Sequence, residues 1–162
     1  MSPYLKSIAL CALFAGLAAC NRSAEQTAKP APAPAQVDDA RLARADAEPQ
    51  NWLAHGGNQQ AQRFSGLDQI TPDNVSRLKP AWYLEFDTYR GQESTPLVVD
   101  GVIYVTTAWS KVYAVDGRTG KALWQFDPQV PGPAAAKNCC DVVSRGAAVY
   151  RGRCMWRLTT DG

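Results

Sequence analysis

The sequence predicts an all-β fold, and its regularity favours a β-propeller over a sandwich or a barrel. Short runs of β-branched, aromatic and aliphatic residues alternate between residues 81 and 126 with turns that contain glycine. Such spacing is typical of all three architectures. Residues 98–105 are then echoed by residues 149–156, which lie 51 positions later. Because this separation is near the size of one four-stranded blade with a long loop, the partial repeat favours the propeller.

The composition agrees with a folded β-rich body and argues against nucleic-acid binding. The 162 residues are 46% hydrophobic and 20% charged, and the formal net charge is only +2. Lysine and arginine are not clustered, so we expect no nucleic-acid partner. All five tryptophans lie after residue 50, which indicates that the aromatic-packed body begins near that point.

The first twenty residues have the pattern of an export signal. Residues 1–6 carry one positive charge, and residues 7–18 are an apolar stretch too short to span a bilayer as a helix. Residues 17–20, Leu-Ala-Ala-Cys, resemble a bacterial lipobox, in which the cysteine is acylated before cleavage. We therefore expect residues 1–19 to be a lipoprotein signal peptide and Cys20 to carry the lipid. The alternative is an ordinary signal peptide that contains Cys20.

Residues 20–50 are predicted to tether the body to a membrane surface. They contain no aromatic residue, and proline alternates with small residues in 29–35. Such a composition favours an extended polyproline II spacer and cannot bury enough apolar surface to fold alone. A short helix within residues 38–47 is possible on a weak apolar face. We expect the ordered body to cover residues 51–162.

The predicted elements of the body follow one another with clear boundaries. Thr71 and Pro72 form a helix start, as N-cap and first helical residue, and Pro80 ends the single turn that follows. Asp100-Gly101 is a hairpin signal between two later strands. The expected strands are residues 81–86, 96–99, 102–107, 111–116 and 122–126.

Residues 114–124 carry a spaced motif around the turn that joins the last two of these strands. Its five defining positions are Ala114, Asp116, Thr119, Gly120 and Trp124. The aspartate, threonine and glycine suit a tight turn. The motif is similar to the tryptophan-docking motif of quinoprotein propellers, which have eight blades. This resemblance implies that the chain contains the first blade or blades of such a propeller, and that Trp124 lies flat between blades over Ala114 and the next turn.

Cys139 and Cys140 are adjacent, which restricts their chemistry. Neighbouring Cα atoms are about 3.8 Å apart, below the usual range for a disulfide, so a bridge between them strains the intervening peptide. The residues alone leave three states open: a strained bridge, two thiols or part of a metal site. For a metal site, only His55 and Cys154 are available as partners, and neither has suitable spacing.

Residues 138–146 resemble the alcohol dehydrogenase branch of the quinoproteins that use pyrroloquinoline quinone (PQQ). In that family, a disulfide between the two adjacent cysteines packs on one face of PQQ. The resemblance therefore implies that Cys139 and Cys140 are bridged and contact the cofactor. It implies further contacts from Glu93, which matches an acid that hydrogen-bonds the quinone, and from Arg145, because guanidinium suits quinone and carboxylate oxygens. Ser144 departs from the asparagine that the family usually has.

The same resemblance implies the activity and the missing parts of the site. The expected reaction is oxidation of primary alcohols to aldehydes in the periplasm, with electrons passed to cytochrome c or a quinone. The family holds a calcium ion beside PQQ, and its metal ligands and catalytic base come from later blades, so none is expected in this chain. A haem c domain is possible in a full-length protein. We expect these 162 residues alone to be inactive.

A second function from another class also fits part of the sequence. Scaffold lipoproteins of outer-membrane protein assembly have similar blades and a lipobox, but they are not enzymes. A scaffold has no need for a vicinal disulfide, for Glu93 or for Arg145, so these residues favour the enzyme. His55 is the only histidine, and we expect it to be structural because the family's general base is a carboxylate elsewhere.

Overall fold

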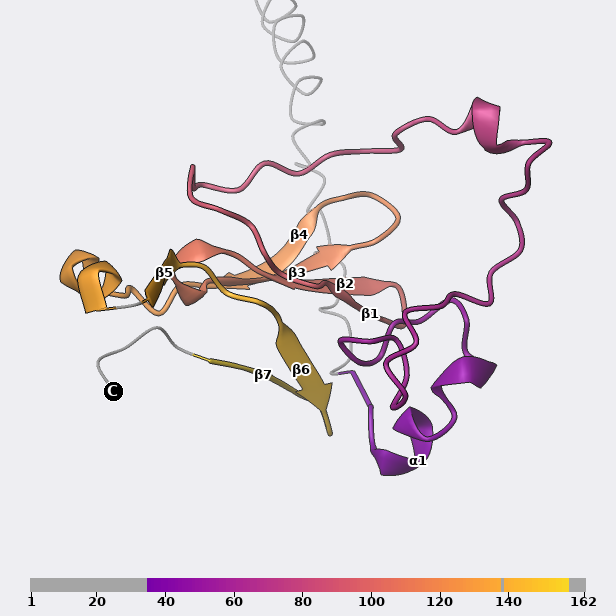
Figure 1. Ribbon diagram of the computed structural model, residues 1–162, viewed down its shortest axis with the longest axis horizontal. Helices are drawn as coiled ribbons and strands as arrows, with labels where there is room; N and C mark the ends of the chain where they lie inside the picture. The colour runs from indigo at the N-terminus through magenta and orange to yellow at the C-terminus, as the bar shows by residue number, and fades with distance from the viewer. Residues whose placement is uncertain (1–34, 138, 158–162) are drawn as a thin grey trace, which may run out of the picture. The chain divides into compact units, whose positions relative to one another are not determined.

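The computed structural model describes residues 35–137 and 139–157 of the chain (Figure 1). The predicted signal peptide, the acylation at Cys20 and the first half of the predicted tether lie outside these residues. Among the described residues, no helix is both long and apolar enough to cross a membrane. The same part of the chain contains seven strands and only short helices, which confirms the all-β prediction.

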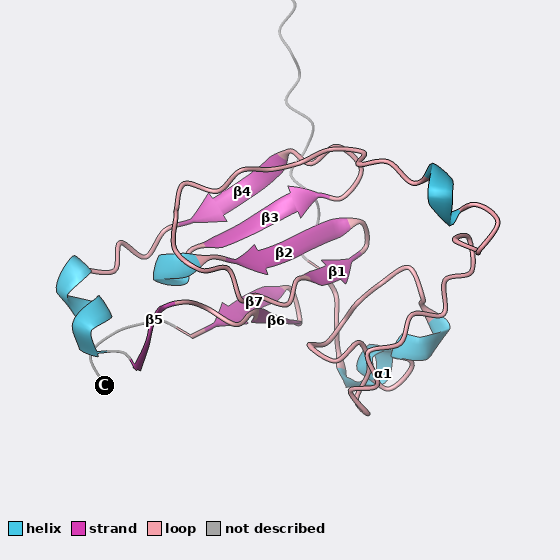
Figure 2. Cartoon of the chain, turned by 45° about the horizontal axis from the view of Figure 1, so that its top comes forward, coloured by secondary structure: helices cyan, strands magenta, loops and turns pink. Residues whose placement is uncertain are grey.

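A four-stranded antiparallel sheet forms the body, with its strands in sequence order (Figure 2). The strands are β1 (Leu97–Val99), β2 (Val102–Thr106), β3 (Val112–Asp116) and β4 (Ala122–Phe126). Alternate side chains of β2 are buried, whereas the first four residues of β3 are all buried. This up-and-down order is that of one propeller blade, as the sequence predicts.

A second hairpin repeats the first part of this sheet. It consists of β6 (Ala147–Tyr150) and β7 (Arg153–Trp156), and its turn corresponds to the turn between β1 and β2. Asp100 and Arg151 have φ of 53° and 48°, and each is followed by a glycine that also has positive φ. Two successive residues in this region form the turn that matches the twist of a hairpin. The predicted repeat therefore has the same backbone geometry in both copies.

The other elements are short and lie between or before the strands. Asn74, rather than Thr71, precedes the single turn of helix: its side chain accepts a hydrogen bond from the Thr71 amide, and helical geometry begins at Val75. The prediction of one turn is correct, but its start was placed too early. These elements are α1 (Asp39–Leu42), the 3₁₀ helices η1 (Ala45–Ala47), η2 (Val75–Arg77), η3 (Ala108–Ser110) and η4 (Gly132–Lys137), and β5 (Cys139–Val142).

Residues 81–86, predicted as a strand, are not assigned to one in the structure. Their side chains do alternate between exposed and half-buried, as in a strand. However, side chains rather than a backbone ladder attach this segment to the sheet: the Phe86 ring packs on Tyr113 with centroids 4.9 Å apart. The prediction was wrong because alternation reports which side chains are buried and says nothing about a hydrogen-bonding partner.

The turn after β3 has the geometry that the motif predicts, and Trp82 docks on it. The Asp116 side chain accepts hydrogen bonds from the amides of Arg118 and Thr119. The Trp82 indole N–H donates to the Gly117 carbonyl at 3.0 Å, and its ring lies against Gly120, where an added Cβ would be 2.5 Å from the indole. Trp82 therefore occupies this turn. Trp124 lies opposite Ala114 in the sheet and keeps 39% of its surface exposed, and its docking over the next turn stays a prediction.

Residues 35–41 contact the turns of both hairpins, although the sequence assigns them to the tether. Val37 is fully buried, and its carbonyl accepts a hydrogen bond from the Arg151 amide at 2.7 Å. The Ala35 carbonyl accepts from the Gly152 amide at 2.9 Å. At the first hairpin, the Arg41 side chain binds Asp100. We call residues 35–41 the clamp, because they attach to both turns.

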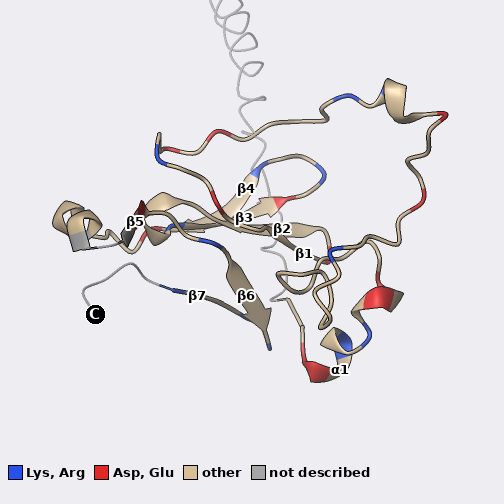
Figure 3. Cartoon of the chain, viewed as in Figure 1, with Lys and Arg blue, Asp and Glu red and all other residues tan. Residues whose placement is uncertain are grey.

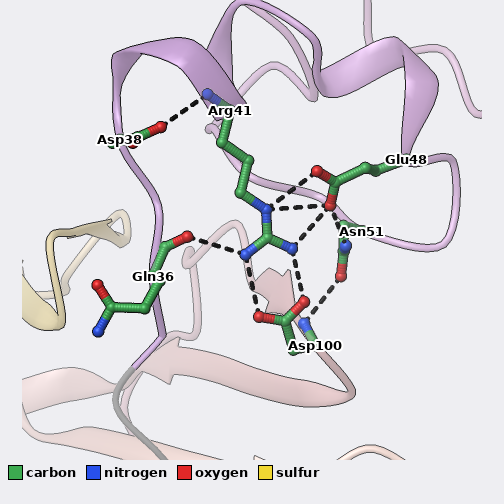
Figure 4. A network of polar contacts seen from close by, with 6 residues as sticks. All are labelled: Gln36, Asp38, Arg41, Glu48, Asn51 and Asp100. Atoms are coloured by element: carbon green, nitrogen blue, oxygen red, sulfur yellow. Dashed lines mark hydrogen bonds and ion pairs between the residues drawn. The ribbon is translucent and has the colours of Figure 1, made fainter.

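Arg41 is the centre of a polar cluster that orders the clamp (Figure 4). Its guanidinium group donates to Glu48 and Asp100 and to the Gln36 carbonyl, and 16% of its side chain is exposed. Asn51 links the two acids by donating to Glu48 and accepting from the Asp100 amide. Because Arg41 bonds to both carboxyl groups, the pKa values of Glu48 and Asp100 lie below their usual range.

Acidic and basic residues are distributed along the loops and strand ends (Figure 3). No single element carries charges of one sign over its whole length.

We expect Trp82→Ala to lower the free energy of unfolding by about 3 kcal/mol, because it removes a packed aromatic ring and a hydrogen bond. Trp124→Ala is the matched control, and its more exposed ring predicts less than half that loss. Urea unfolding of the purified protein measures both. Equal losses for the two variants would contradict the assignment of Trp82 as the docked residue.

The clamp also predicts an acid-dependent loss of stability. The folded-state pKa values of Glu48 and Asp100 are lowered, so their contribution is present above about pH 4 and is lost as the pH falls through the folded values. Arg41→Gln should reduce stability at pH 7 and make its decline below about pH 4 shallower. Arg44→Gln alters an exposed arginine nearby and should change neither. Parallel acid profiles for wild type and Arg41→Gln would refute this role.

Candidate functional site

The predicted cofactor residues lie on three neighbouring segments. Glu93 precedes β1, Cys140 lies on β5, and Arg145 lies just before β6. The Thr95 amide donates to the Arg145 carbonyl at 3.1 Å, and Thr95 forms a parallel bridge with Gly146. Segments that are fifty residues apart in the sequence are therefore joined beside the candidate site.

Glu93 and Arg145 contact each other directly. Arg145 Nε lies 3.3 Å from Glu93 Oε2, and the two side chains are 74% and 48% exposed, respectively. Such an exposed pair contributes little to stability. It also leaves guanidinium N–H groups and a carboxylate oxygen accessible. The arrangement can therefore bind a ligand that carries both acceptor and donor groups, such as PQQ, whose carboxylate and quinone oxygens accept hydrogen bonds and whose pyrrole N–H donates one.

Hydroxyl groups of Thr106 and Ser94 connect the two segments that carry Glu93 and Arg145. Thr106 at the end of β2 is fully buried, and its Oγ1 lies 3.0 Å from Ser94 Oγ and 3.5 Å from the Ser144 carbonyl. The Thr106 amide also donates to Ser94 Oγ at 3.1 Å. Thus the residue next to Glu93 and the residue next to Arg145 attach to the same strand end. Ser144 itself is buried, so its small side chain fits where the family usually has asparagine.

The cysteines have different surroundings. Cys140 is exposed, and the side chain of Cys139 lies outside the described residues, so their pairing stays a prediction. Cys154 packs against the core of the hairpin, and burial raises its thiol pKa to about 11. A thiol with such a pKa reacts slowly at neutral pH, which leaves the adjacent pair as the candidate for chemistry. No group of three or more potential ligands among the described residues is placed to hold a metal ion.

Sequence reasoning missed three residues beside this site. The guanidinium of Arg90 lies 5.9 Å from the centre of the Trp109 ring, and its Nη1 is 3.2 Å from both carboxylate oxygens of Asp141. Asp141 directly follows Cys140. No periodicity or residue spacing in the sequence indicates these contacts of Arg90. The unusual backbone of Trp109 and Asp141, which would have marked them, is visible only in the structure.

His55 lies apart from this group and contacts Arg63, with 2.7 Å between His55 Nε2 and Arg63 Nη2. Since the guanidinium can only donate, the imidazole nitrogen acts as the acceptor. Its backbone carbonyl accepts a hydrogen bond from the Trp52 indole at 3.4 Å. His55 is exposed in the loop that precedes the sheet, and its structural role stays a prediction.

Comparisons with known proteins agree on one family. The family model described as glucose/ethanol/alcohol dehydrogenase, β-propeller domain, which is named for PQQ, matches residues 52–160. The dehydrogenase subunit of a quinone alcohol dehydrogenase from Komagataeibacter europaeus is 56% identical over 112 residues, which are 69% of this chain and 15% of that protein.

Solved structures that resemble this chain are also dehydrogenases. A quinohemoprotein alcohol dehydrogenase from Pseudomonas putida superposes with a TM-score of 0.76 at 46% identity, over 79% of this chain and 19% of that one. A europium-containing methanol dehydrogenase superposes with a TM-score of 0.68 at 36% identity, over 74% of this chain and 21% of that one. The chain thus spans about a fifth or less of the length of these relatives.

Proposed function

Because the chain belongs to the PQQ-dependent glucose, ethanol and alcohol dehydrogenase family of β-propellers, we propose that it supplies one wall of a PQQ site. The observation that carries the proposal is the contact between Glu93 and Arg145 beside the strand of Cys140. The whole protein, on this proposal, oxidises primary alcohols to aldehydes. It passes the electrons to cytochrome c or to a quinone, and a small alcohol is its substrate.

Each residue of the wall has a distinct task. Arg145 donates hydrogen bonds to oxygens of PQQ, and its charge offsets the nearby carboxylate. Glu93 accepts a hydrogen bond from the cofactor and is held in place by Arg145. Cys139 and Cys140, bridged as the family resemblance implies, present a flat surface to one face of the ring. When bound, PQQ supplies the redox chemistry, since its quinone accepts the electrons of the alcohol.

The remaining parts of the site are proposed to lie beyond these residues. A metal ion, calcium or another cation, would polarise the quinone, and a separate carboxylate would act as base on the alcohol. A similar solved structure is described as a europium-containing dehydrogenase, which supports a metal in the family. The quinohemoprotein relative supports haem c as a second cofactor of a full-length protein.

We also propose a periplasmic location with a lipid anchor on Cys20. The support is the sequence of residues 1–20, an apolar stretch that ends in Leu-Ala-Ala-Cys. The proline-containing residues 29–34 would then separate the folded body from the membrane.

Arg145→Gln should weaken PQQ binding at least about tenfold, because a charge-assisted hydrogen bond to an anionic ligand is lost. Arg145→Lys should weaken it less, since the charge remains without the planar donor group. Quenching of tryptophan fluorescence by added PQQ measures the dissociation constants. Arg118→Gln, on the turn after β3, is the control and should bind as wild type does. Unchanged binding by Arg145→Gln would overturn the proposed role.

The lipid anchor predicts that Cys20→Ser abolishes incorporation of labelled palmitate in cells. The variant should also shift from the membrane to the periplasmic fraction. Cys11→Ser, inside the proposed signal peptide, should be labelled as wild type is. Labelling that persists in Cys20→Ser would show that the cysteine is not the site of acylation.

A further inference from the structure

Arg90 joins two segments that flank the candidate cofactor wall. Its guanidinium lies over the Trp109 ring and against both oxygens of Asp141. Its amide donates to Thr88 Oγ1, and its carbonyl accepts from Gln92, so its own loop is ordered on both sides of the residue. The contacts link the loop that leads to Glu93, the 3₁₀ helix η3 and the strand β5.

Both partners of Arg90 have backbone conformations that residues other than glycine rarely adopt. Trp109 has φ of 63° and the following Ser110 has φ of 56°, whereas Asp141 has φ of 64°. Such a backbone conformation is strained in a residue other than glycine and persists only where surrounding contacts hold it. Arg90 is the residue whose side chain binds both segments. The side chain of Arg90 therefore contacts two segments whose backbone is strained.

The position of Asp141 connects this support to the cysteine pair. Asp141 is the third residue of β5, directly after Cys139 and Cys140. The neighbouring Val143 lies beside Gly91, where an added Cβ would be 3.5 Å from a valine methyl group. Movement of Asp141 would therefore displace Cys140, which is exposed on the same strand.

We infer that Arg90 is a positioning residue for Cys139 and Cys140. It fixes their strand through its ion pair with Asp141, and its own guanidinium is fixed by packing on the Trp109 ring. The inference rests on the proposed function, since the cysteine pair is oriented by this contact toward PQQ. Arg90 itself does not touch the reacting atoms. Its side chain is half-exposed and its partner carboxylate less so, so the contact orients the strand more than it stabilises the fold.

The test measures how fast iodoacetamide alkylates Cys139 and Cys140 while a reductant without thiols, tris(2-carboxyethyl)phosphine, keeps any bridge between them open. Peptide mass spectrometry follows each site. Arg90→Gln removes both the ion pair and the cation–π contact and should increase the rate about tenfold. Asp141→Asn removes only the ion pair and should give a smaller increase. The double variant should equal Arg90→Gln, because that variant already lacks both contacts. Arg90→Lys should restore part of the protection.

Two controls separate positioning from general loosening. Cys154, half-buried on β7 with a raised thiol pKa, is alkylated slowly and reports on general loosening of the fold; its slow rate should be the same as in the wild type in every variant. Arg151→Gln removes the other cation–π arginine, 5.1 Å from the Tyr150 ring, and should leave the pair unchanged. A parallel PQQ titration by fluorescence quenching should show weaker binding for Arg90→Gln and Asp141→Asn, and wild-type binding for Arg151→Gln.

Wild-type alkylation rates in Arg90→Gln would overturn the inference, as would an equal acceleration at Cys154. Additive effects in the double variant would also overturn it, because Arg90 would then act independently of Asp141. Failure of the wild-type protein to bind PQQ would instead refute the proposed function, since the alkylation rates do not require the cofactor. Faster alkylation with unchanged PQQ binding would refute the role toward the cofactor.

Discussion

The candidate site depends on one contact between segments that are fifty residues apart. The backbone of Thr95 meets that of Arg145 and Gly146, and the buried hydroxyl of Thr106 lies against both segments. β1 follows the first segment and β6 follows the second, so each hairpin unit begins at this contact. Glu93 and Arg145 project from its two sides. Without the contact, two exposed and oppositely charged side chains would have no reason to stay together.

The N-terminal clamp acts on the opposite ends of the same two hairpins. Arg41 binds at Asp100 in the first turn, and the carbonyls of Ala35 and Val37 bind the second turn. The two hairpins are thus joined at both ends, at one by the clamp and at the other by the segments of the site. A displacement of one unit against the other has to break polar contacts at both places.

Much of this fold is predictable from the sequence because the signals are local. The Asp100-Gly101 turn, the strands that flank it and the turn at Asp116 follow from residue types at fixed spacing. The prediction of a strand at residues 81–86 was wrong because an alternating pattern does not show which strand, if any, the segment pairs with. The docked Trp82 was missed because its contact lies 35 residues away in the chain.

For the site, family resemblance identified Glu93 and Arg145, whose contact no periodicity could indicate. The clamp and Arg90 were missed for a related reason. Arg41 and Arg90 each look like an ordinary charged residue in a polar stretch until the fold brings carboxylates to them.

The central claim is that Glu93, Cys140 and Arg145 form one wall of a PQQ site. The most direct test is titration of the ¹⁵N-labelled protein with PQQ, followed by NMR of backbone amides and arginine side chains. We expect saturable shifts for residues 93–95 and 139–146 and for the Arg145 Nε–H. The turn residues 116–120 should not shift. The absence of saturable shifts, or shifts confined to other parts of the chain, would contradict the claim.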